Sequence, residues 1–526
     1  MPSRRSLRSA LRDAAGVAIG VGVLAAGTLT ACTSTVSGSP ARLGAPVAGT
    51  PRPSPIAFND CTATLLNAGV PVPKPLKGTV RFGCGQLTVP LDYRHPDGAS
   101  INLSVIRIHS TLNTTTPVQS LLVNPGGPGG GGLDFGLGLL GQMSPAVTRH
   151  FDIVAFDPRG VGQSAPVQCL TNAQKDRFLA ASPNTTTRAG ILAEERQTRQ
   201  FSSGCADHVG SGLQFYNTVS TARDMDQLRQ AVGDDVMNYL GFSYGTELGW
   251  TYAHLFPQLV HTFVLDGAVD PTQVHKENST VQLKGFESAF GQFAAWCKSA
   301  PACSRLPDPT RAVEQIYAAA RRAPLSTGSS RRLTESLAST GVIEALYSRS
   351  SWPHLADALT AAQHGDGAGL LQLADRYNQR QADGSYANII DANITISCND
   401  SPARKPPAVS TILRRSQALA RRFPLFGSDV GGGPGCLGWQ PHRTPVPPPS
   451  APTPKPVLVV GNLHDPATPY QGAVNLTTAL GNAGLLSWNG EGHTSYLSGS
   501  SCVDHYVNDY LIHGTMPPDH TVCPAK

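Results

Sequence analysis

A serine placed between two glycines constrains the fold of this chain more than any other feature. Ser243 is the centre of the sequence GFSYG (residues 241–245), between an apolar run, 236–240, and a helix-like segment, 246–256. A strand that turns sharply into a helix at a serine is the G-x-S-x-G elbow that presents a nucleophile. Glycines are needed there because the turn leaves no room for neighbouring side chains. A glycine-flanked serine can also simply cap a helix. The rest of the chain must therefore distinguish a nucleophile from a helix cap.

Two later segments supply the partners that a serine nucleophile needs. Its hydroxyl becomes reactive when a histidine takes the proton, and that histidine needs a carboxylate to orient it. The predicted strand 456–460 leads into Asp465 on a tight turn, and the predicted last strand, 485–488, leads into a glycine-rich loop with His493. The chain order Ser243, Asp465, His493 is the order of the α/β-hydrolase fold. We therefore predict that these residues form a catalytic triad.

Other residues compete for these roles. Asp266 also follows a strand and is an alternative acid, although a turn or cap-anchoring role fits it better. His464 and His505 are rival bases, but neither lies in a glycine-rich loop after the last strand. Asp157 and Arg159 follow another strand, and we interpret them as a salt bridge that organises their loop.

A glycine-rich segment, residues 125–132, follows the predicted strand 120–124. Such a backbone carries no side-chain bulk, so the N–H of Gly126 or Gly127 can converge with that of Tyr244 on a developing oxyanion. With Asp152 the segment also approximates a dinucleotide fingerprint, but so glycine-dense a run does this by composition and lacks the lysine of a P-loop. We predict an oxyanion hole from Gly126, Gly127 and Tyr244, with no cofactor and no metal.

The order of elements predicts an α/β fold with a helical insertion. Strands alternate with helices in residues 59–271 and 455–526, which implies a mostly parallel sheet covered on both faces. One of these helices is expected to begin near Thr221, in a variant capping box with Asp224.

The strand signal is lost between these two core parts. Helical patterns occur at 281–296, 311–322, 333–347, 355–363 and 409–422. We predict that residues 272–454 form a helical cap on the α/β-hydrolase core, which excludes water and limits access to the serine.

The N-terminus predicts export. Arginines precede an apolar stretch, 14–29, that is too short and too rich in glycine and alanine to span a bilayer comfortably, so residues 1–31 are interpreted as a signal peptide. Leu29-Thr30-Ala31-Cys32 resembles the lipobox of bacterial lipoproteins, in which the cysteine receives a diacylglycerol. An ordinary signal peptide with an incidental cysteine is the alternative, and the export route stays open. Residues 32–58, rich in Ser, Pro, Gly and Ala, are the expected tether.

Ten cysteines remain after Cys32, and an even number in an exported chain indicates disulfides. The sequence contains no C-x-x-C pair, so a cysteine-bound metal site is not expected. Connectivity does not follow from sequence, although neighbouring cysteines suggest Cys61 with Cys84, Cys169 with Cys205, Cys297 with Cys303, Cys398 with Cys436, and Cys502 with Cys523. The net charge is +5, and the basic residues are scattered along the sequence without the clustering that is typical of nucleic-acid-binding proteins.

The chain resembles the exported tripeptidyl aminopeptidase and proline iminopeptidase branch of the α/β-hydrolases. The resemblance covers roughly residues 61–523 and rests on NPGGPG (124–129), FDPRG (156–160), GFSYGT (241–246), DPATP (465–469) and GH (492–493). It implies a cell-surface serine peptidase, lipid-anchored to the bacterial membrane or partly shed, that removes short pieces from peptide N-termini. Proline iminopeptidases typically carry a histidine where this chain has Asn124-Pro125, which favours the tripeptidyl side.

Two other functions stay open on the sequence alone. An esterase or lipase would use the same triad and the same acyl-enzyme route, whereas a non-catalytic lipoprotein that binds peptides or glycans would require a broken triad. An enzyme that measures from a free N-terminus also needs an acidic group for the ammonium. Asp400, Glu491 and Glu287 are candidates, and a structural carboxylate is the alternative for each.

Overall fold

The computed structural model describes residues 52–113, 115–274, 279–427, 436–450 and 452–525. The predicted signal peptide, Cys32 and most of the predicted tether lie outside these ranges. The chain joins the core slightly before residue 59, because Ile56 donates its N–H to Ala231 O (3.2 Å) and the Arg107 guanidinium lies 4.5 Å from the Phe58 ring. Within these ranges, every helix is too short or too polar to serve as a membrane span.

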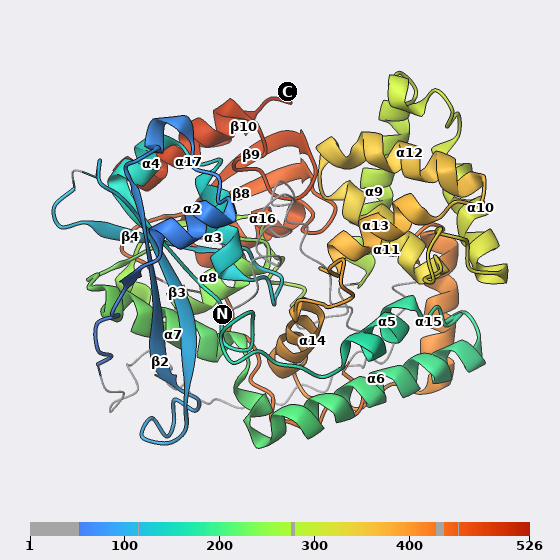
Figure 1. The fold of residues 1–526 in the computed structure, drawn as a ribbon, viewed down its shortest axis with the longest axis horizontal. Coiled ribbons are helices and arrows are strands. Elements are labelled where there is room, and N and C mark those ends of the chain that lie inside the picture. Colours follow the sequence, from blue (N-terminus) through green and yellow to red (C-terminus); the bar gives the residue numbers. More distant parts are fainter. Residues whose placement is uncertain (1–51, 114, 275–278, 428–435, 451, 526) are drawn as a thin grey trace.

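Ten strands form a single sheet (Figure 1). They are β1 Asn59–Asp60, β2 Val80–Pro90, β3 Ser100–Ser110, β4 Gln119–Asn124, β5 Phe151–Phe156, β6 Met237–Phe242, β7 Val260–Asp266, β8 Val457–His464, β9 Ala483–Glu491 and β10 Val522–Cys523. The order across the sheet is β1-β2-β3-β5-β4-β6-β7-β8-β9-β10. Pairings from β1 to β3 and between β3 and β5 are antiparallel, and all others are parallel. The ends of β4 and β6 to β9 therefore meet at one edge of the sheet, where parallel sheets place their sites.

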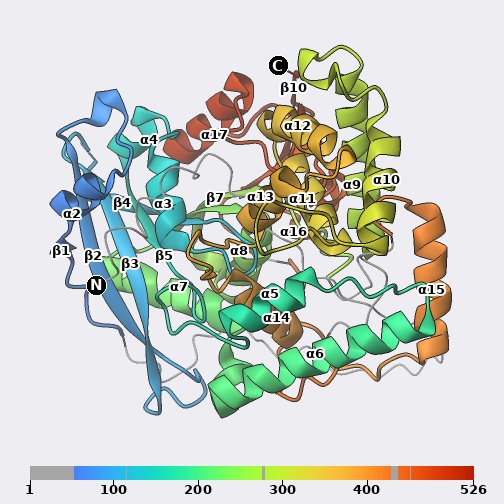
Figure 2. The ribbon, with the colours of Figure 1, turned by 45° about the vertical axis from the view of Figure 1, so that its right-hand side comes forward.

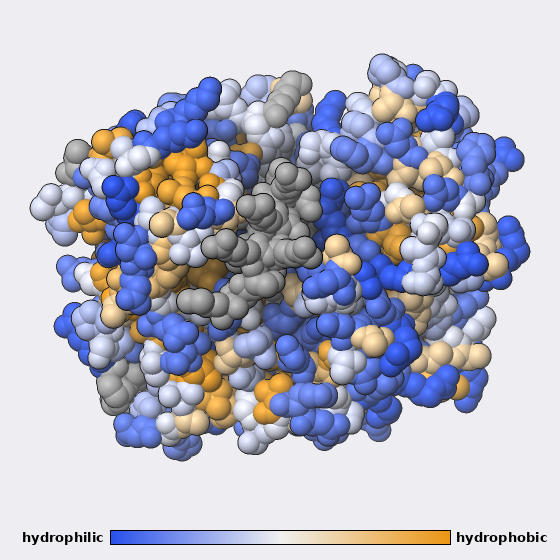
Figure 3. Space-filling view, in the orientation of Figure 1, coloured by the Kyte–Doolittle hydropathy of each residue, from blue (hydrophilic) through white to orange (hydrophobic). Residues whose placement is uncertain are grey.

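Helices cover both faces of this sheet because alternate residues of a buried strand point to opposite sides. Leu121 and Val123 pack on one face, and Leu122 packs on the other. The first face carries α2 Thr62–Ala68, α3 Gly132–Leu140, α4 Pro145–His150 and α17 Ser501–His513; the second carries α7 Thr218–Val232, α8 Tyr244–Leu255 and α16 Gln471–Leu480. Apolar surface gathers over α2 and α3 in Figure 3, where Leu66 is 46 % exposed.

The chain between β7 and β8 is helical and forms a second hydrophobic core beside the sheet (Figure 1). Its helices are α9 Ser279–Cys297, α10 Pro309–Arg322, α11 Glu335–Leu346, α12 Trp352–Gln363, α13 Ala368–Tyr377, α14 Ile389–Asp400 and α15 Val409–Arg422. The sequence patterns missed α13 and α14. In α14 the periodicity is hidden because polar side chains, among them Asp391, Asn393 and Asn399, are buried and bond to neighbouring loops.

Two helices from a different part of the sequence join this helical region. α5 Asn172–Ala180 and α6 Arg188–Val209 lie between β5 and β6, yet they pack beside α11, α14 and α15 (Figure 2). Lys175 forms a buried ion pair with Asp391, and Arg380 Nε lies 2.8 Å from Asp176 Oδ1. α5 and α6 thus belong in sequence to the segment 59–271 and pack against helices of the segment 272–454.

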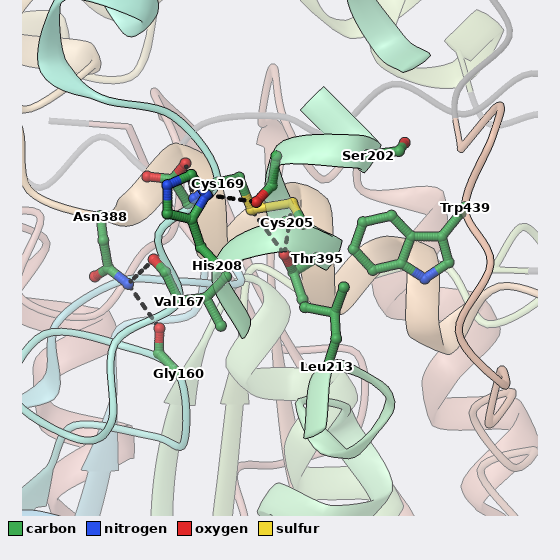
Figure 4. Close-up of a disulfide and its surroundings, with 12 residues drawn as sticks. Gly160, Val167, Cys169, Ser202, Cys205, His208, Leu213, Asn388, Thr395 and Trp439 are labelled. Carbon is green, nitrogen blue, oxygen red and sulfur yellow. Dashed lines mark hydrogen bonds between the residues drawn. A yellow bond between two sulfur atoms is a disulfide. The ribbon is translucent and has the colours of Figure 1, made fainter. Parts of the chain in front are cut away.

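The ten cysteines form five disulfides: Cys61–Cys84, Cys169–Cys205, Cys297–Cys303, Cys398–Cys436 and Cys502–Cys523. Figure 4 shows the Cys169–Cys205 bridge beside α14, with the Thr395 hydroxyl 3.7 Å and 3.9 Å from the two sulfur atoms. This disulfide ties the end of α6 to the chain that precedes α5, so it closes the part of the helical region that comes from before β6.

Two local predictions are wrong. Arg159 does not pair with Asp157 but with Asp224 on α7, at 2.7 Å from Nε to Oδ2, and both side chains are fully buried. Asp157 instead accepts the N–H groups of Leu133 and Gln163. The helix near Thr221 begins earlier because its cap is Asn217, whose Oδ1 accepts the Ser220 N–H at 2.8 Å. Asp224 is therefore unavailable for the expected capping box.

Candidate active site

Ser243 occupies a sharp turn between β6 and α8. Its backbone is left-handed, with φ 55° and ψ −125°, and its N–H donates to Asp266 O at 2.9 Å. A Cβ atom on Gly241 would lie 2.5 Å from Gly245 O, and one on Gly245 would lie 3.0 Å from Asn124 Oδ1. A side chain at residue 241 would thus collide with the backbone and one at residue 245 would crowd Asn124, and the strained serine lies at the edge of the sheet where a nucleophile is presented.

His493 and Asp465 meet directly beyond β8 and β9. His493 Nδ1 lies 2.9 Å from each carboxylate oxygen of Asp465. The carboxylate is itself fixed, because it accepts the backbone N–H groups of Ala467, Thr468 and Thr494 at 2.8 to 3.0 Å. His493 Nε2 is buried and has no hydrogen-bond partner among the described residues. An imidazole bound to a carboxylate through Nδ1 presents Nε2 for proton transfer.

The competing acid and bases have other positions. Asp266 lies at the end of β7, and its carboxylate accepts the N–H groups of Ser495 and Tyr496, so it supports the loop that follows His493. Burial raises the pKa of Asp266 to about 7, with a further increase from the charge of Asp465. His464 Nε2 lies 3.2 Å from Asn489 Oδ1, and His505 is exposed on α17.

The glycine-rich loop after β4 lies directly on the elbow. A Cβ atom on Gly126 would lie 2.3 Å from Phe242 O and 2.9 Å from Tyr244 N, and φ is 90° at Gly126 and 121° at Gly127. The Gly126 N–H, however, donates to Asn124 Oδ1 at 2.9 Å. Tyr244 is the first residue of α8, and the first N–H groups of a helix have no intrahelical acceptor. Gly127 and Tyr244 are thus better placed as oxyanion donors than Gly126.

The helical region contacts both the glycine-rich loop and the turn that carries Ser243. Asn393 of α14 donates to Pro128 O at 3.0 Å. The Tyr244 hydroxyl bonds to Thr218 Oγ1, which donates to Asp400 Oδ2 at 2.6 Å. Asp400, at the end of α14, is fully buried, and burial raises its pKa to about 7. Residues of the helical region therefore support the proposed oxyanion donors.

A cavity of about 630 Å³ opens beside His493. Its lining includes α3, the turn after α11, the end of β9 and the loop that follows β9. Aromatic walls come from Phe135, Tyr347 and Trp488, and the acidic side chains Asp134 and Glu491 lie in its lining. Within the described ranges, no three His, Cys, Asp or Glu side chains are grouped so as to hold a metal ion.

Only one of the three candidates for an ammonium-binding carboxylate lines this cavity. Glu491 does so, and burial raises its pKa. Asp400 is engaged by Thr218 beneath the elbow, and Glu287 accepts the N–H groups of Leu425 and Phe426. Asp400 and Glu287 therefore have structural partners that account for them.

Comparison with known proteins identifies the family of the chain. The family model of the α/β hydrolase fold matches residues 119–500, which is more than half of the chain. The chain belongs to the α/β-hydrolase family. The predicted fold class is thereby confirmed.

Relatives with named activities cover most of the chain. It is 38 % identical over 509 residues to serine protease Hip1 of Mycobacterium tuberculosis, covering 93 % of this chain and 94 % of that protein. It is 39 % identical over 454 residues to carboxylesterase B of the same species, with 84 % and 86 % covered. Tripeptidyl aminopeptidase of Streptomyces lividans is 30 % identical over 491 residues, with 89 % and 86 % covered. The predicted resemblance to serine peptidases is confirmed, and the chain is a serine hydrolase.

Proposed function

We propose that this chain is an exported serine aminopeptidase, of the tripeptidyl type, that acts through an acyl-enzyme on Ser243. The observation that carries the proposal is the pairing of His493 Nδ1 with Asp465, which leaves Nε2 buried and without a hydrogen-bond partner among the described residues, at the same edge of the sheet as Ser243. The names of two relatives, a serine protease and a tripeptidyl aminopeptidase, support peptide or protein substrates.

The proposed reaction begins when Ser243 Oγ attacks the substrate carbonyl carbon and gives its proton to His493 Nε2. Asp465 stabilises the imidazolium through Nδ1 and remains ionised. The N–H groups of Gly127 and Tyr244 stabilise the oxyanion. The C–N bond then breaks as Nε2 protonates the leaving amine, and water, deprotonated by the same nitrogen, hydrolyses the acyl-enzyme.

The cavity beside His493 is the proposed binding site for the substrate. Its aromatic walls suit side chains of a short peptide, and Glu491 is the candidate partner for a free N-terminal ammonium because opposite charges attract strongly where water is partly excluded. Asp134 lies in the same lining and is the second candidate.

An esterase is the second candidate function, and the relative named carboxylesterase B favours it. Ester and amide hydrolysis share the acyl-enzyme, so the ratio of kcat/KM for a peptide amide and the matching ester separates the two activities.

The proposed location is the outer face of the cell membrane. Residues 1–31 would act as the signal peptide and Cys32 as the lipidated residue, with a tether that ends near residue 58. Five disulfides within the described residues support an oxidising compartment. The proposed domains are a core of 59–271 and 455–526 and a helical cap of 272–454; α5 and α6 belong to the first core segment in sequence and pack against the cap.

Mass spectrometry of digestion products tests this function. Purified protein is given a peptide with a free N-terminus and its N-acetylated twin, with Ser243→Ala as the control. We expect release of tripeptides from the free peptide only. Cleavage of both peptides would identify an endopeptidase instead, and cleavage of neither, with hydrolysis of an ester, would favour the esterase.

A further inference from the structure

The loop that carries His493 is bound by the helical region as well as by the core. The backbone N–H of His493 donates to Tyr347 O at 2.8 Å, and Ser348 and Gly492 form an antiparallel β-bridge. Tyr347 and Ser348 belong to the turn after α11, some 145 residues before His493 in the chain. The helical region is thus joined to the histidine loop as one strand is joined to another.

The Tyr347 side chain also contacts the imidazole. The two ring centroids are 5.2 Å apart and the ring planes are nearly perpendicular, at 88°. Both side chains are buried, with exposures of 5 % for Tyr347 and 8 % for His493. Edge-to-face contacts of this kind are specific in geometry. Asp465 therefore orients the imidazole through Nδ1, and the Tyr347 ring restricts where the ring plane can lie.

Gly492 is fitted to this contact. Its φ is 101°, and a Cβ atom there would lie 2.7 Å from Tyr347 O and 3.3 Å from Ser348 Cα. The close approach of the two segments consequently requires glycine at the residue immediately before His493.

Tyr347 is in turn held by the core of the helical region. Its ring centroid lies 5.8 Å from that of Phe286 on α9 and 6.0 Å from that of Tyr377 on α13. Any displacement of these helices would therefore move the ring that contacts His493.

We propose that Tyr347 is a positioning residue that couples the packing of the helical region to the orientation of the His493 imidazole. The inference rests on the proposed triad. It makes the helical region a requirement for proton transfer itself and not only a cover over the substrate.

Substitution at Tyr347 tests the coupling. In Tyr347→Leu the ring is lost, and we expect kcat to fall by about 10- to 100-fold, since a displacement of about 1 Å can cost 100-fold. Tyr347→Phe keeps the ring and should stay within about twofold of wild type. Phe290→Leu is the matched control, because it removes a ring of the same helical core that contacts the Phe293 ring rather than Tyr347, and its kcat should change by less than about threefold.

The readout separates positioning from substrate contact, because Tyr347 also lines the cavity. Each variant is assayed with p-nitrophenyl acetate, which is too small to fill the cavity, and with a tripeptide amide. Loss of kcat with both substrates supports positioning. Loss with the peptide alone, mainly through KM, would overturn it, as would an equal loss in Phe290→Leu. Melting temperatures verify folding, and Tyr347→Met replaces Tyr347→Leu if the latter does not fold.

A fluorophosphonate probe distinguishes this inference from the function on which it rests. If wild type is not labelled, the proposed triad fails. If wild type is labelled and Tyr347→Leu is labelled at the same rate, the triad stands and the role of Tyr347 is contradicted.

Discussion

The sheet and the helical region contribute to the site in different ways. The sheet carries Ser243, Asp465 and His493 after β6, β8 and β9, whose carboxyl ends lie at the same edge because the strands are parallel. The helical region supplies no member of this triad. It instead supplies contacts to the proposed triad and its neighbours: Tyr347 on His493, and Asn393 on the glycine-rich loop. The residues proposed to react thus come from the sheet region, and contacts that position them come in part from the helical region.

The strongest test on the sheet side compares Asp465 with Asp266, a buried aspartate at the end of the neighbouring strand. Asp465→Asn keeps the shape of the side chain but no longer stabilises the correct tautomer of His493, and kcat should fall by about 10,000-fold. Asp266→Asn retains an acceptor for the loop N–H groups and should lower kcat by less than about 100-fold. Steady-state kinetics on one peptide amide measures both. An equal fall in kcat in the two variants would contradict the assignment of Asp465 as the carboxylate that serves His493.

Gly492 tests the junction between the two regions. Gly492→Ala adds a Cβ atom 2.7 Å from Tyr347 O and should lower kcat by about 10- to 100-fold. Gly514→Ala is the control, because φ is 70° there but nothing lies within 4 Å of the added atom. It should lower the melting temperature and leave kcat unchanged. An unchanged kcat in Gly492→Ala would argue that the junction does not matter.

Asn393 tests the support of the glycine-rich loop. Asn393→Ala removes the bond to Pro128 O, and the loss of about 1 kcal/mol corresponds to about a fivefold fall in kcat. Asn388→Ala, at the cap of α14, removes three bonds to a different loop: its amide donates to Gly160 O and Val167 O, and its Oδ1 accepts the Gly162 N–H. It should reduce stability without changing kcat. Equal changes in kcat would mean that α14 acts on the site only through general packing.

The smallest expected effect is a pH dependence of stability. Burial raises the pKa of Glu247, one turn into α8, to about 8, and the charge of Asp400 adds to this. Because the folded state keeps this proton to higher pH than the unfolded chain, the free energy of unfolding should decrease as pH rises from about 4.5 to about 8. Glu247→Gln should show a smaller decrease in urea denaturation at the two ends of this range. An unchanged pH dependence would contradict the raised pKa.

Much of the core could be predicted from the sequence because its signals are local. Apolar strands, the glycines around Ser243 and the strand-end positions of Asp465 and His493 are visible in short segments. The contacts from the helical region could not be predicted in this way. Tyr347 is one aromatic residue in an apolar helix, and only the folded chain brings it to His493.

Buried polar pairs were misassigned for the same reason. Arg159 was expected to pair with the nearby Asp157, whereas its partner, Asp224, is 65 residues away. The Gly126 N–H is likewise engaged by the side chain of Asn124, a detail of geometry that a glycine-rich sequence does not reveal.

Reaction of the protein with a fluorophosphonate, followed by intact mass measurement and peptide mapping, tests the central claim most directly. The account predicts one label per chain, on Ser243, with no label in Ser243→Ala and slow labelling in His493→Ala. A label on another serine, or an unlabelled wild-type protein that still hydrolyses peptides, would contradict a nucleophile at the β6–α8 turn.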